Sequence, residues 1–274
     1  MTTAKEFLKE GNLNAALEAL QDEVRANPAD AKKRIFLFQL LAVLGNWDRA
    51  LNQLNVVADL DPGSLAMVQT YRELLRCEAL REAVFEGSRS PLVFGDPERW
   101  IALALEALKL DASGKHDQAQ AMRGEAYEAA EVSAGTIADD AFEWVADADS
   151  RIGPFLEAIV NGNYYWVPFS RIRSITLEPP EDLRDLVWAP AQFTWANGGE
   201  TVGFIPSRYP GSSAAADSRL ALAQKTEWEQ KAEDVYFGTG QRILATDAGE
   251  YSLLEVRSIQ LHSGDEPGDA ANES

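Results

Sequence analysis

Apolar residues in the first half of the chain recur at helical spacing. Between Ile35 and Leu44 every position except Gln39 is apolar, and between Ser64 and Phe85 apolar residues such as Val68, Tyr71 and Leu75 recur three or four residues apart. A period near 3.6 residues is typical of amphipathic helices, and a helix that is apolar on all sides must be covered on more than one side. We therefore predict a stack of helices, with the 31–44 helix inside it.

The same half of the chain repeats itself. The run GNLNAAL at 11–17 is echoed by GNWDRAL at 45–51, and Pro28 is echoed by Pro62, each at an offset of 34 residues. This period is typical of tetratricopeptide repeats, in which a glycine turn joins two antiparallel helices and a proline closes the unit. A weaker third copy starts at Gly114, so we predict a closing helix over 117–132 with the polar outer face that ends such an array.

A predicted loop over 87–95 interrupts this array. Helix formation resumes where Asp96 is placed to cap a helix whose first residue is Pro97, and this helix is expected to reach Ala112. Proline suits the first helical turn because the N–H that it lacks has no helical partner there.

Turn signals divide the second half into hairpins. Asn161-Gly162 separates two apolar runs, so we expect Leu156–Val160 to pair with Tyr164–Phe169, because a two-residue type I′ turn favours Asn-Gly. Two more hairpins are expected around the turns at 197–199 and 247–249. The remaining predicted strands cover 172–177, 187–195, 201–205, 242–246 and 251–261.

Three segments of this half are less regular. Pro190 interrupts the 187–195 strand, and since proline cannot donate a ladder hydrogen bond, we predict an edge strand or a bulge there. The alanine-rich stretch 214–235 favours a helix, and the run at 209–213 predicts an exposed loop.

These patterns predict an α+β protein. A tetratricopeptide-like α-helical array over 1–135 is followed by an antiparallel β-rich domain over 136–263. The tail 264–274 is acidic and has no apolar residue larger than alanine, so we expect it to be disordered.

Charge and composition exclude several classes of partner. The chain carries 44 acidic and 25 basic residues, a net charge of −19, which disfavours phosphate backbones and anionic membrane surfaces. No apolar run approaches the roughly 20 residues that span a bilayer. The single cysteine, Cys77, lies in an apolar helical stretch and is expected to be buried and inert. A cytoplasmic location without an export signal is therefore expected.

Candidate chemistry is sparse. The two histidines, His116 and His262, lie in different predicted domains, and neither zinc spacing nor an HExxH helix is present. Gly238-Thr239-Gly240 precedes a predicted strand, whereas a phosphate-binding glycine loop follows a strand and opens a helix. We expect no cofactor and no metal.

The strongest polar cluster is Asp147, Asp149 and Arg151, between the two predicted domains. Paired carboxylates are able to bind a cation or act as acid and base, although two aspartates supply few ligands for a metal ion. The structural alternative is an inter-domain brace, in which Arg151 pairs with one carboxylate and the other caps a backbone turn. Contact with a partner is a third possibility.

Aromatic residues gather in the second half. Most must fill the core of a small sheet, but tryptophan, tyrosine and arginine also dominate interface hot spots. We therefore take Trp188, Trp195, Arg208 and Tyr209 as candidate partner-binding residues, with Arg208 and Tyr209 as an exposed pair before a Pro-Gly turn.

Three blocks of the second half resemble one family. WVADADSRIGPFLEAIVNG at 144–162, DLVWAPAQFTWANGGETVGFIPSRYPGS at 185–212 and GTGQRILATDAGEYSLLEVRSI at 238–259 occur in the order found in the ImpE family. The resemblance covers nearly the whole chain except the acidic tail. It implies an accessory protein of bacterial type VI secretion, a contractile injection machine.

The resemblance also implies partners. Members of the family bind the N-terminal segment of the small contractile-sheath subunit and provide a link to the ClpV AAA+ ATPase. The family has no catalytic motif to transfer, so we expect a non-enzymatic adaptor, and an acidic adaptor favours a partner segment that carries basic residues. The sequence leaves open whether the array or the β-rich domain holds this segment. An enzyme or ligand-binding protein with a site at the domain junction, or a scaffold unrelated to secretion, remains the alternative.

Overall fold

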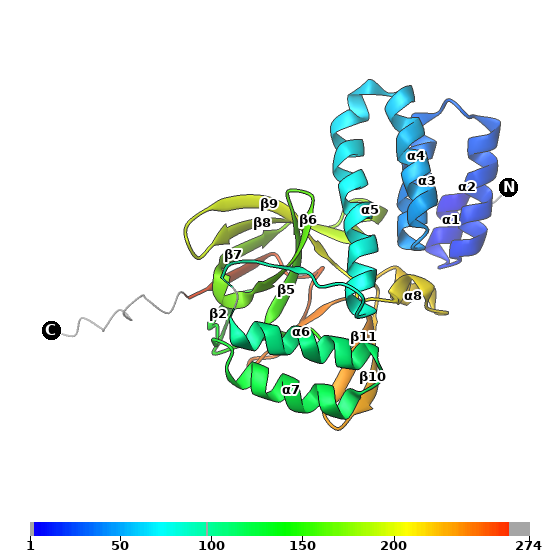
Figure 1. The fold of residues 1–274 in the computed structure, drawn as a ribbon. Helices are drawn as coiled ribbons and strands as arrows, with labels where there is room; N and C mark the ends of the chain where they lie inside the picture. Colours follow the sequence, from blue (N-terminus) through cyan, green and yellow to red (C-terminus); the bar gives the residue numbers. More distant parts are fainter. Residues whose placement is uncertain (1–2, 97, 263–274) are drawn as a thin grey trace.

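The computed structural model describes residues 3–96 and 98–262. Helices fill the first half of the chain, and antiparallel strands fill most of the second half, which confirms the predicted α+β class (Figure 1). The predicted disordered tail lies outside the described residues.

Two helical hairpins form the start of the chain. Their helices are α1 (Ala4–Lys9), α2 (Leu13–Ala26), α3 (Ala31–Val43) and α4 (Trp47–Leu60). Gly11 and Gly45 sit in the turns with φ values of +73° and +68°, a left-handed conformation that favours glycine. The 34-residue repeat therefore corresponds to two copies of one hairpin. The all-apolar α3 packs between α2 and α4, as its sequence predicts.

A long helix then leads from the array to the sheet. This helix, α5, runs from Leu65 to Phe85 and packs against α4 on one side and strand β6 on another. The third hairpin, α6 (Arg99–Ala112) and α7 (His116–Glu128), lies below the sheet rather than beside α4 (Figure 1). Gly114 turns between these two helices with φ of +73°, like the earlier turn glycines.

Two predicted helix ends need correction. Helix α6 begins at Arg99 rather than at position 97, and Glu98 precedes it without a side-chain cap; Pro97 lies outside the described residues. Helix α7 ends at Glu128 rather than Val132. The polar position Arg123 of this helix is buried, where it pairs with Asp111 of α6.

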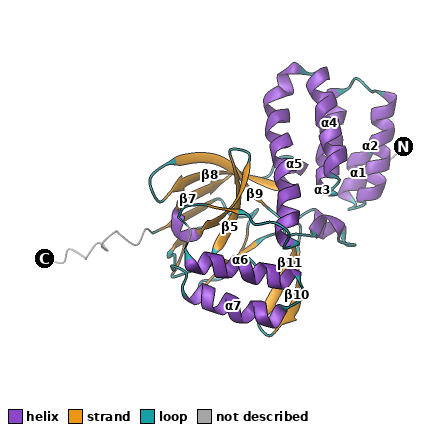
Figure 2. Cartoon of the chain, viewed as in Figure 1, coloured by secondary structure: helices purple, strands orange, loops and turns teal. Residues whose placement is uncertain are grey.

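The β-rich region contains one large sheet and two small ones. Nine strands follow the order β1-β6-β5-β9-β8-β7-β14-β2-β3, three form β13-β12-β4, and two form β10-β11. Among the described residues, all strand pairs are antiparallel except β1 with β6. The strands are β1 (Leu92–Val93), β2 (Gly135–Ile137), β3 (Asp140–Phe142), β4 (Val145–Asp147), β5 (Phe155–Val160), β6 (Asn163–Pro168), β7 (Ile172–Leu177), β8 (Trp188–Trp195), β9 (Glu200–Pro206), β10 (Thr226–Ala232), β11 (Val235–Gly240), β12 (Ile243–Thr246), β13 (Glu250–Ser252) and β14 (Ser258–Leu261). Figure 2 shows how the helices border the sheet on the side of α5 and on the side of α6 and α7.

The predicted hairpins are present. Strand β5 pairs with β6 as expected, with Leu156 opposite Val167, and Asn161 and Gly162 turn with φ of +50° and +70°. Strands β8 and β9 form the second hairpin and β12 and β13 the third. The strand predicted over 251–261 is split, however, because β13 ends at Ser252 and β14 pairs with β7 and β2 of the large sheet.

Pro190 does not mark an edge strand. Strand β8 lies inside the large sheet between β7 and β9, with Pro190 opposite Phe204. The carbonyl of Pro190 accepts a bond from the N–H of Glu178, one residue beyond the end of β7, at 3.5 Å. The N and C=O of one strand residue point towards the same neighbouring strand. The N–H that Pro190 lacks would therefore point towards β7, at a place beyond the last residue of that strand.

The helix predicted over 214–235 is wrong. The segment holds only a short helix, α8 (Ser218–Ala221), and then forms β10, which pairs with β11 so that Trp228 lies opposite Gly238. Ala223 ends the helical turn with φ of +53°. Helix propensity is a weak local preference, and the pairing with β11 overrides it.

Candidate functional site

The junction between helix α5 and the sheet holds a buried ionic network around Glu157. This carboxylate stands in the middle of strand β5, every residue of which is buried. Arg81 of α5 binds it through two nitrogens at 2.6 and 3.1 Å, and Arg242 binds it from the other side. The hydroxyl of Tyr164 donates to it at 2.5 Å. Glu157 thus connects helix α5 with strand β6 and with Arg242, which directly precedes β12.

Two guanidinium groups decide the ionisation of Glu157. Burial alone would raise the pKa of its carboxyl, but Arg81 and Arg242 outweigh this effect and lower the pKa to about 2. Glu157 is therefore ionised throughout the physiological range. Its charge is compensated by two cations that are themselves enclosed, and Arg242 and Glu157 have no exposed side-chain surface at all.

Asp147 extends this network towards the turn at 147–153. It pairs with Arg242, accepts the hydroxyl of Tyr209 at 2.9 Å and accepts the backbone N–H of Asp149 at 2.9 Å. Burial raises the pKa of the Asp147 carboxyl to about 6, against the opposing effect of Arg242. The N–H contact from two residues ahead is the turn-capping geometry expected of one of the two aspartates.

Asp149 and Arg151 form the expected direct pair. The Arg151 guanidinium binds both oxygens of Asp149, at 2.9 and 2.5 Å, and Asp149 also accepts the backbone N–H of Gly238 at 2.7 Å. Arg151 lies over the rings of Phe85 in α5 and Phe237 in β11, at 5.2 and 4.3 Å. The pair therefore touches the end of α5 and the small β10-β11 sheet.

All four carboxylate oxygens of Asp147 and Asp149 already accept hydrogen bonds from the protein. A cation or substrate at this place would have to displace those donors. Within 3–96 and 98–262, no three His, Cys, Asp or Glu side chains come together as a group able to hold a metal ion.

The candidate partner-binding residues are buried, which corrects the expectation of an exposed pair. Relative exposures are 0% for Trp188, 5% for Trp195, 5% for Arg208 and 1% for Tyr209. The loop predicted over 209–213 is likewise partly enclosed, since Ser212 is buried. Each polar tip has a partner inside the protein, which is how such residues are accommodated in a core.

These four residues serve different contacts. Trp188 donates to Glu78 of α5 at 2.8 Å, and Tyr209 belongs to the Asp147 network. Trp195 lies elsewhere, stacked on Phe193 at 4.9 Å. Arg208 extends to helix α3 of the array, where its guanidinium donates to the carbonyl of Val43 at 2.8 Å. It also donates to the carbonyl of Ala221 in α8 at 2.5 Å. A cation is favourable at a helix C-terminus because of the unpaired carbonyls there.

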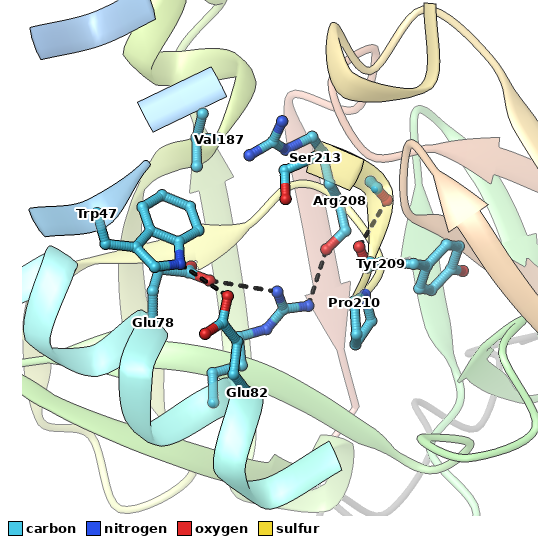
Figure 3. A pocket seen from close by; sticks show the side chains of 11 residues that line it. Trp47, Glu78, Glu82, Val187, Arg208, Tyr209, Pro210 and Ser213 are labelled. Carbon is cyan, nitrogen blue, oxygen red and sulfur yellow. Dashed lines mark hydrogen bonds and ion pairs between the residues drawn. The ribbon is translucent and has the colours of Figure 1, made fainter. Parts of the chain in front are cut away.

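A small cavity lies beside Arg208, between α4, α5 and the loop 208–213 (Figure 3). Its volume is about 30 Å³, enough for water-sized groups only. Trp47 donates to Glu82 on one wall at 2.7 Å, and Arg81 donates to the carbonyl of Arg208 on another at 2.8 Å. This cavity is too small to hold a substrate.

A much larger open groove runs along the array. It lies between α1, α3 and the 3₁₀ helix Leu183–Leu186, has a volume of about 890 Å³, and is called the α1–α3 groove below. Its apolar floor contains Ile35, Phe36, Leu183 and Leu186, all partly exposed. Its polar walls are Thr3, Lys5, Glu23, Asp30, Lys32, Lys33, Gln39, Glu181 and Asp182.

Glu157, the centre of the ionic network, was not among the site residues predicted from the sequence. Glu157 interrupts the apolar run FLEAIV, and a charged residue inside a strand that is otherwise wholly apolar is itself a signal of a buried pair. Its partners Arg81 and Arg242 lie 76 and 85 residues away in the chain. Nothing local in the sequence connects them.

The fold and these contacts define the class of the protein: a tetratricopeptide-like array joined to an antiparallel β-rich region through a closed ionic network, with an open apolar groove. None of the helices among the described residues is both long and apolar enough to cross a membrane. The family model described as ImpE protein matches residues 139–260.

Two known proteins are similar to nearly the whole chain. The type VI secretion system accessory component TagJ of Pseudomonas aeruginosa strain PAO1 is 50% identical over 267 residues, which are 97% of this chain and 92% of the relative. A crystal structure of a Vibrio parahaemolyticus protein superposes with a TM-score of 0.87 at 26% identity, covering 95% of this chain and 98% of that one. The chain belongs to the ImpE family.

Proposed function

We propose that this protein is a non-enzymatic, cytoplasmic adaptor of type VI secretion. In this role it binds the N-terminal segment of the small contractile-sheath subunit and links the sheath to the ClpV ATPase. The observation that carries the proposal is the 50% identity to TagJ, a type VI secretion accessory component, over 97% of this chain. Identity of this extent covers the array and the β-rich region together.

The contacts inside the molecule support a role in binding rather than catalysis. The buried acids that could act as acid, base or metal ligand are bound by arginine, tyrosine and backbone donors. The open α1–α3 groove, by contrast, combines an apolar floor with charged walls. Grooves of helical-repeat arrays commonly receive polypeptide segments.

Co-purification tests the proposed partners. The full chain is immobilised and mixed with purified small sheath subunit, with the same subunit lacking its N-terminal segment, and with ClpV. We expect recovery of the intact subunit and loss of recovery after truncation. We also expect ClpV to be recovered together with the intact subunit. Absence of binding by the intact subunit to folded protein would contradict the proposal.

We assign Asp147, Asp149 and Arg151 the role of a brace between the units 1–135 and 136–263. The contacts of Arg151 with Asp149, Phe85 and Gly238 support this role. In an Arg151→Met variant the carboxylate of Asp149 loses its cation, so we expect the free energy of unfolding to fall by about 3 kcal/mol. Urea unfolding checks the loss. Recovery of the sheath subunit should persist, and its loss in a folded variant would make Arg151 a binding residue instead.

A further inference from the structure

We infer that the outer edge of strand β10 is a second interaction surface, where an extended segment of a partner protein adds an antiparallel strand. The added strand places apolar side chains beside Trp228 and basic side chains beside Glu227 and Glu229. This surface belongs to the β-rich region, and its use does not depend on the sheath binding proposed above.

Strand β11 is paired on both of its edges. One edge faces β10. On the other edge, the backbone groups of Tyr236, Gly238 and Gly240 bind the two turns at 149–151 and 209–212. The N–H and C=O groups of these three residues therefore point away from β10.

Strand β10 is paired on one edge only. Its residues Thr226, Trp228 and Gln230 lie opposite those three residues of β11. Opposite residues of an antiparallel pair direct their backbone groups either towards each other or both outwards, so the groups of these β10 residues point outwards. None of them has a hydrogen-bond partner within 3–96 and 98–262. A free edge of this kind is a template for a further strand.

The edge is open to solvent. Four consecutive residues of β10 are exposed: Glu227, Trp228, Glu229 and Gln230. Helix α7 reaches the hairpin at its turn, where Gln120 donates to the carbonyl of Glu233 at 2.5 Å. The hairpin lies beside α7 at the border of the molecule, away from helices α1 to α4 (Figure 1). An extended segment therefore has access to the edge.

The two faces of β10 differ in chemistry. On one face Trp228 is 38% exposed, and Tyr236 of β11, its diagonal neighbour, is 41% exposed. On the other face the side chains of Glu227 and Glu229 are 59% and 70% exposed, while the lysines that pair with them are only 26% and 27% exposed. Side chains of an added strand alternate between these faces, so alternating apolar and basic residues complement the edge.

A second copy of this chain is a poor occupant of the same edge. Antiparallel pairing of two β10 strands about a two-fold axis at Trp228 aligns the outward backbone groups of both. It also places Glu227 of each copy opposite Glu229 of the other. Like charges directly opposite each other are destabilising. The two acids therefore disfavour self-association and favour a basic segment.

Fluorescence anisotropy with a labelled probe peptide tests the inference on the full chain. The probe has about nine residues, in which lysine and valine alternate, and is long enough to cover β10. We expect this probe to bind, and we expect the same peptide with glutamate in place of lysine to bind at least about tenfold more weakly.

Methylation of the probe's backbone separates strand addition from simple charge attraction. In an antiparallel addition the valines lie beside Trp228 and bond to β10, whereas the lysine N–H groups point away from it. N-methylation of the valine nitrogens should therefore abolish binding. N-methylation of the lysine nitrogens should change the affinity by less than about twofold.

Variants of the chain test the same edge. Gln230→Pro removes one outward N–H and should weaken binding of the lysine-valine probe about tenfold, whereas Gln230→Ala keeps this N–H and should change it less than about twofold. Glu229→Lys should also weaken binding about tenfold. Glu233→Lys is its control, because Glu233 lies in the β10–β11 turn and the substitution changes the net charge equally.

The outcomes decide the edge assignment separately from the proposed function. Absence of probe binding, or equal effects of the two methylations, would overturn strand addition. Equal weakening by Glu229→Lys and Glu233→Lys would reduce the contact to general attraction by an acidic protein, and this pair decides the matter even if Gln230→Pro disturbs the hairpin. Recovery of the sheath subunit should be the same for all four variants. Its failure with the unmodified chain would contradict the adaptor function and leave the edge assignment standing.

Discussion

At the scale of single residues, Glu157 makes the central contacts between helix α5 and the sheet. It is an acid in the middle of an apolar strand, and its charge is compensated by Arg81 from a helix and Arg242 from the other side. A buried pair of this kind adds little net stability when complete, but removal of one partner leaves an uncompensated charge in the core. The residue therefore favours one specific arrangement of α5 on the sheet.

Neutralising this residue should change both stability and its pH dependence. The pKa of Glu157 is about 2 in the folded protein and 4.5 in an unfolded chain, so its contribution is complete above pH 4.5 and is lost as the pH falls towards 2. We expect Glu157→Gln to lower the free energy of unfolding at pH 7 by about 3 kcal/mol. It should also flatten the loss of stability between pH 4.5 and 2.

Urea unfolding at a series of pH values measures both effects. Glu229→Gln is the control, because Glu229 is an exposed acid that pairs with Lys231 at 2.5 Å, and removing it should change stability by less than about 1 kcal/mol. Equal effects of the two substitutions on the free energy of unfolding would show that burial of Glu157 does not contribute to its effect on stability.

At the scale of elements, close approach of a helix to a turn decides where glycine is required. Gly153 has φ of +55°, and a Cβ there would lie 2.3 Å from the ring of Tyr127 in α7. Tyr127 also donates to the carbonyl of Ser150 at 3.1 Å. The α6–α7 hairpin is therefore seated directly on the turn that follows β4.

Gly153→Ala should separate these two elements. Gly198 in the β8–β9 turn is the matched control, because it has φ of +84° but no atom within 4 Å of the place where the alanine methyl group would lie. Both variants carry backbone strain of about 1–2 kcal/mol, and only Gly153→Ala adds the collision, for roughly 1–3 kcal/mol more. Equilibrium urea unfolding compares the two. Similar losses would mean that α7 moves aside without cost.

At the scale of the whole molecule, Arg208 holds the array against the β-rich region. Its guanidinium reaches the carbonyls of Val43 in α3 and Ala221 in α8. Burial lowers the pKa of Arg208 to about 10, so the side chain stays charged at neutral pH. The contact lies at the C-terminal end of α3, beyond the α1–α3 groove.

Arg208→Met should loosen this junction while leaving most of the apolar contacts of the side chain in place. The freed carbonyls lose their donor, so we expect amide hydrogens of α3 and α8 to exchange at least tenfold faster, while those of β5 and β6 change little. Hydrogen exchange read by mass spectrometry measures this difference. Arg219→Met is the control, since Arg219 is exposed and pairs with Asp217 at 2.7 Å. Uniform acceleration across all elements would point to general destabilisation instead of a local joint.

The sequence alone determined the features that depend on neighbours in the chain. The 34-residue repeat located the two N-terminal helical hairpins, and Asn161-Gly162 located the first β-hairpin. Pairing of Arg151 with a nearby aspartate was one of the alternatives that residue chemistry offered, and Asp149 is the aspartate that it contacts. Helical period, turn conformation and short-range ion pairs are properties of a few consecutive residues, so they can be predicted without the fold.

Only the tertiary structure decided which polar residues are buried and what they bind. Arg208 and Tyr209 follow a strand and precede a Pro-Gly turn, which is typical of a surface loop, yet α3 and β4 enclose them. Glu157 finds its cations 76 and 85 residues away, and 226–232 became a strand because β11 lies beside it. Such outcomes depend on contacts between distant segments, which no local pattern encodes.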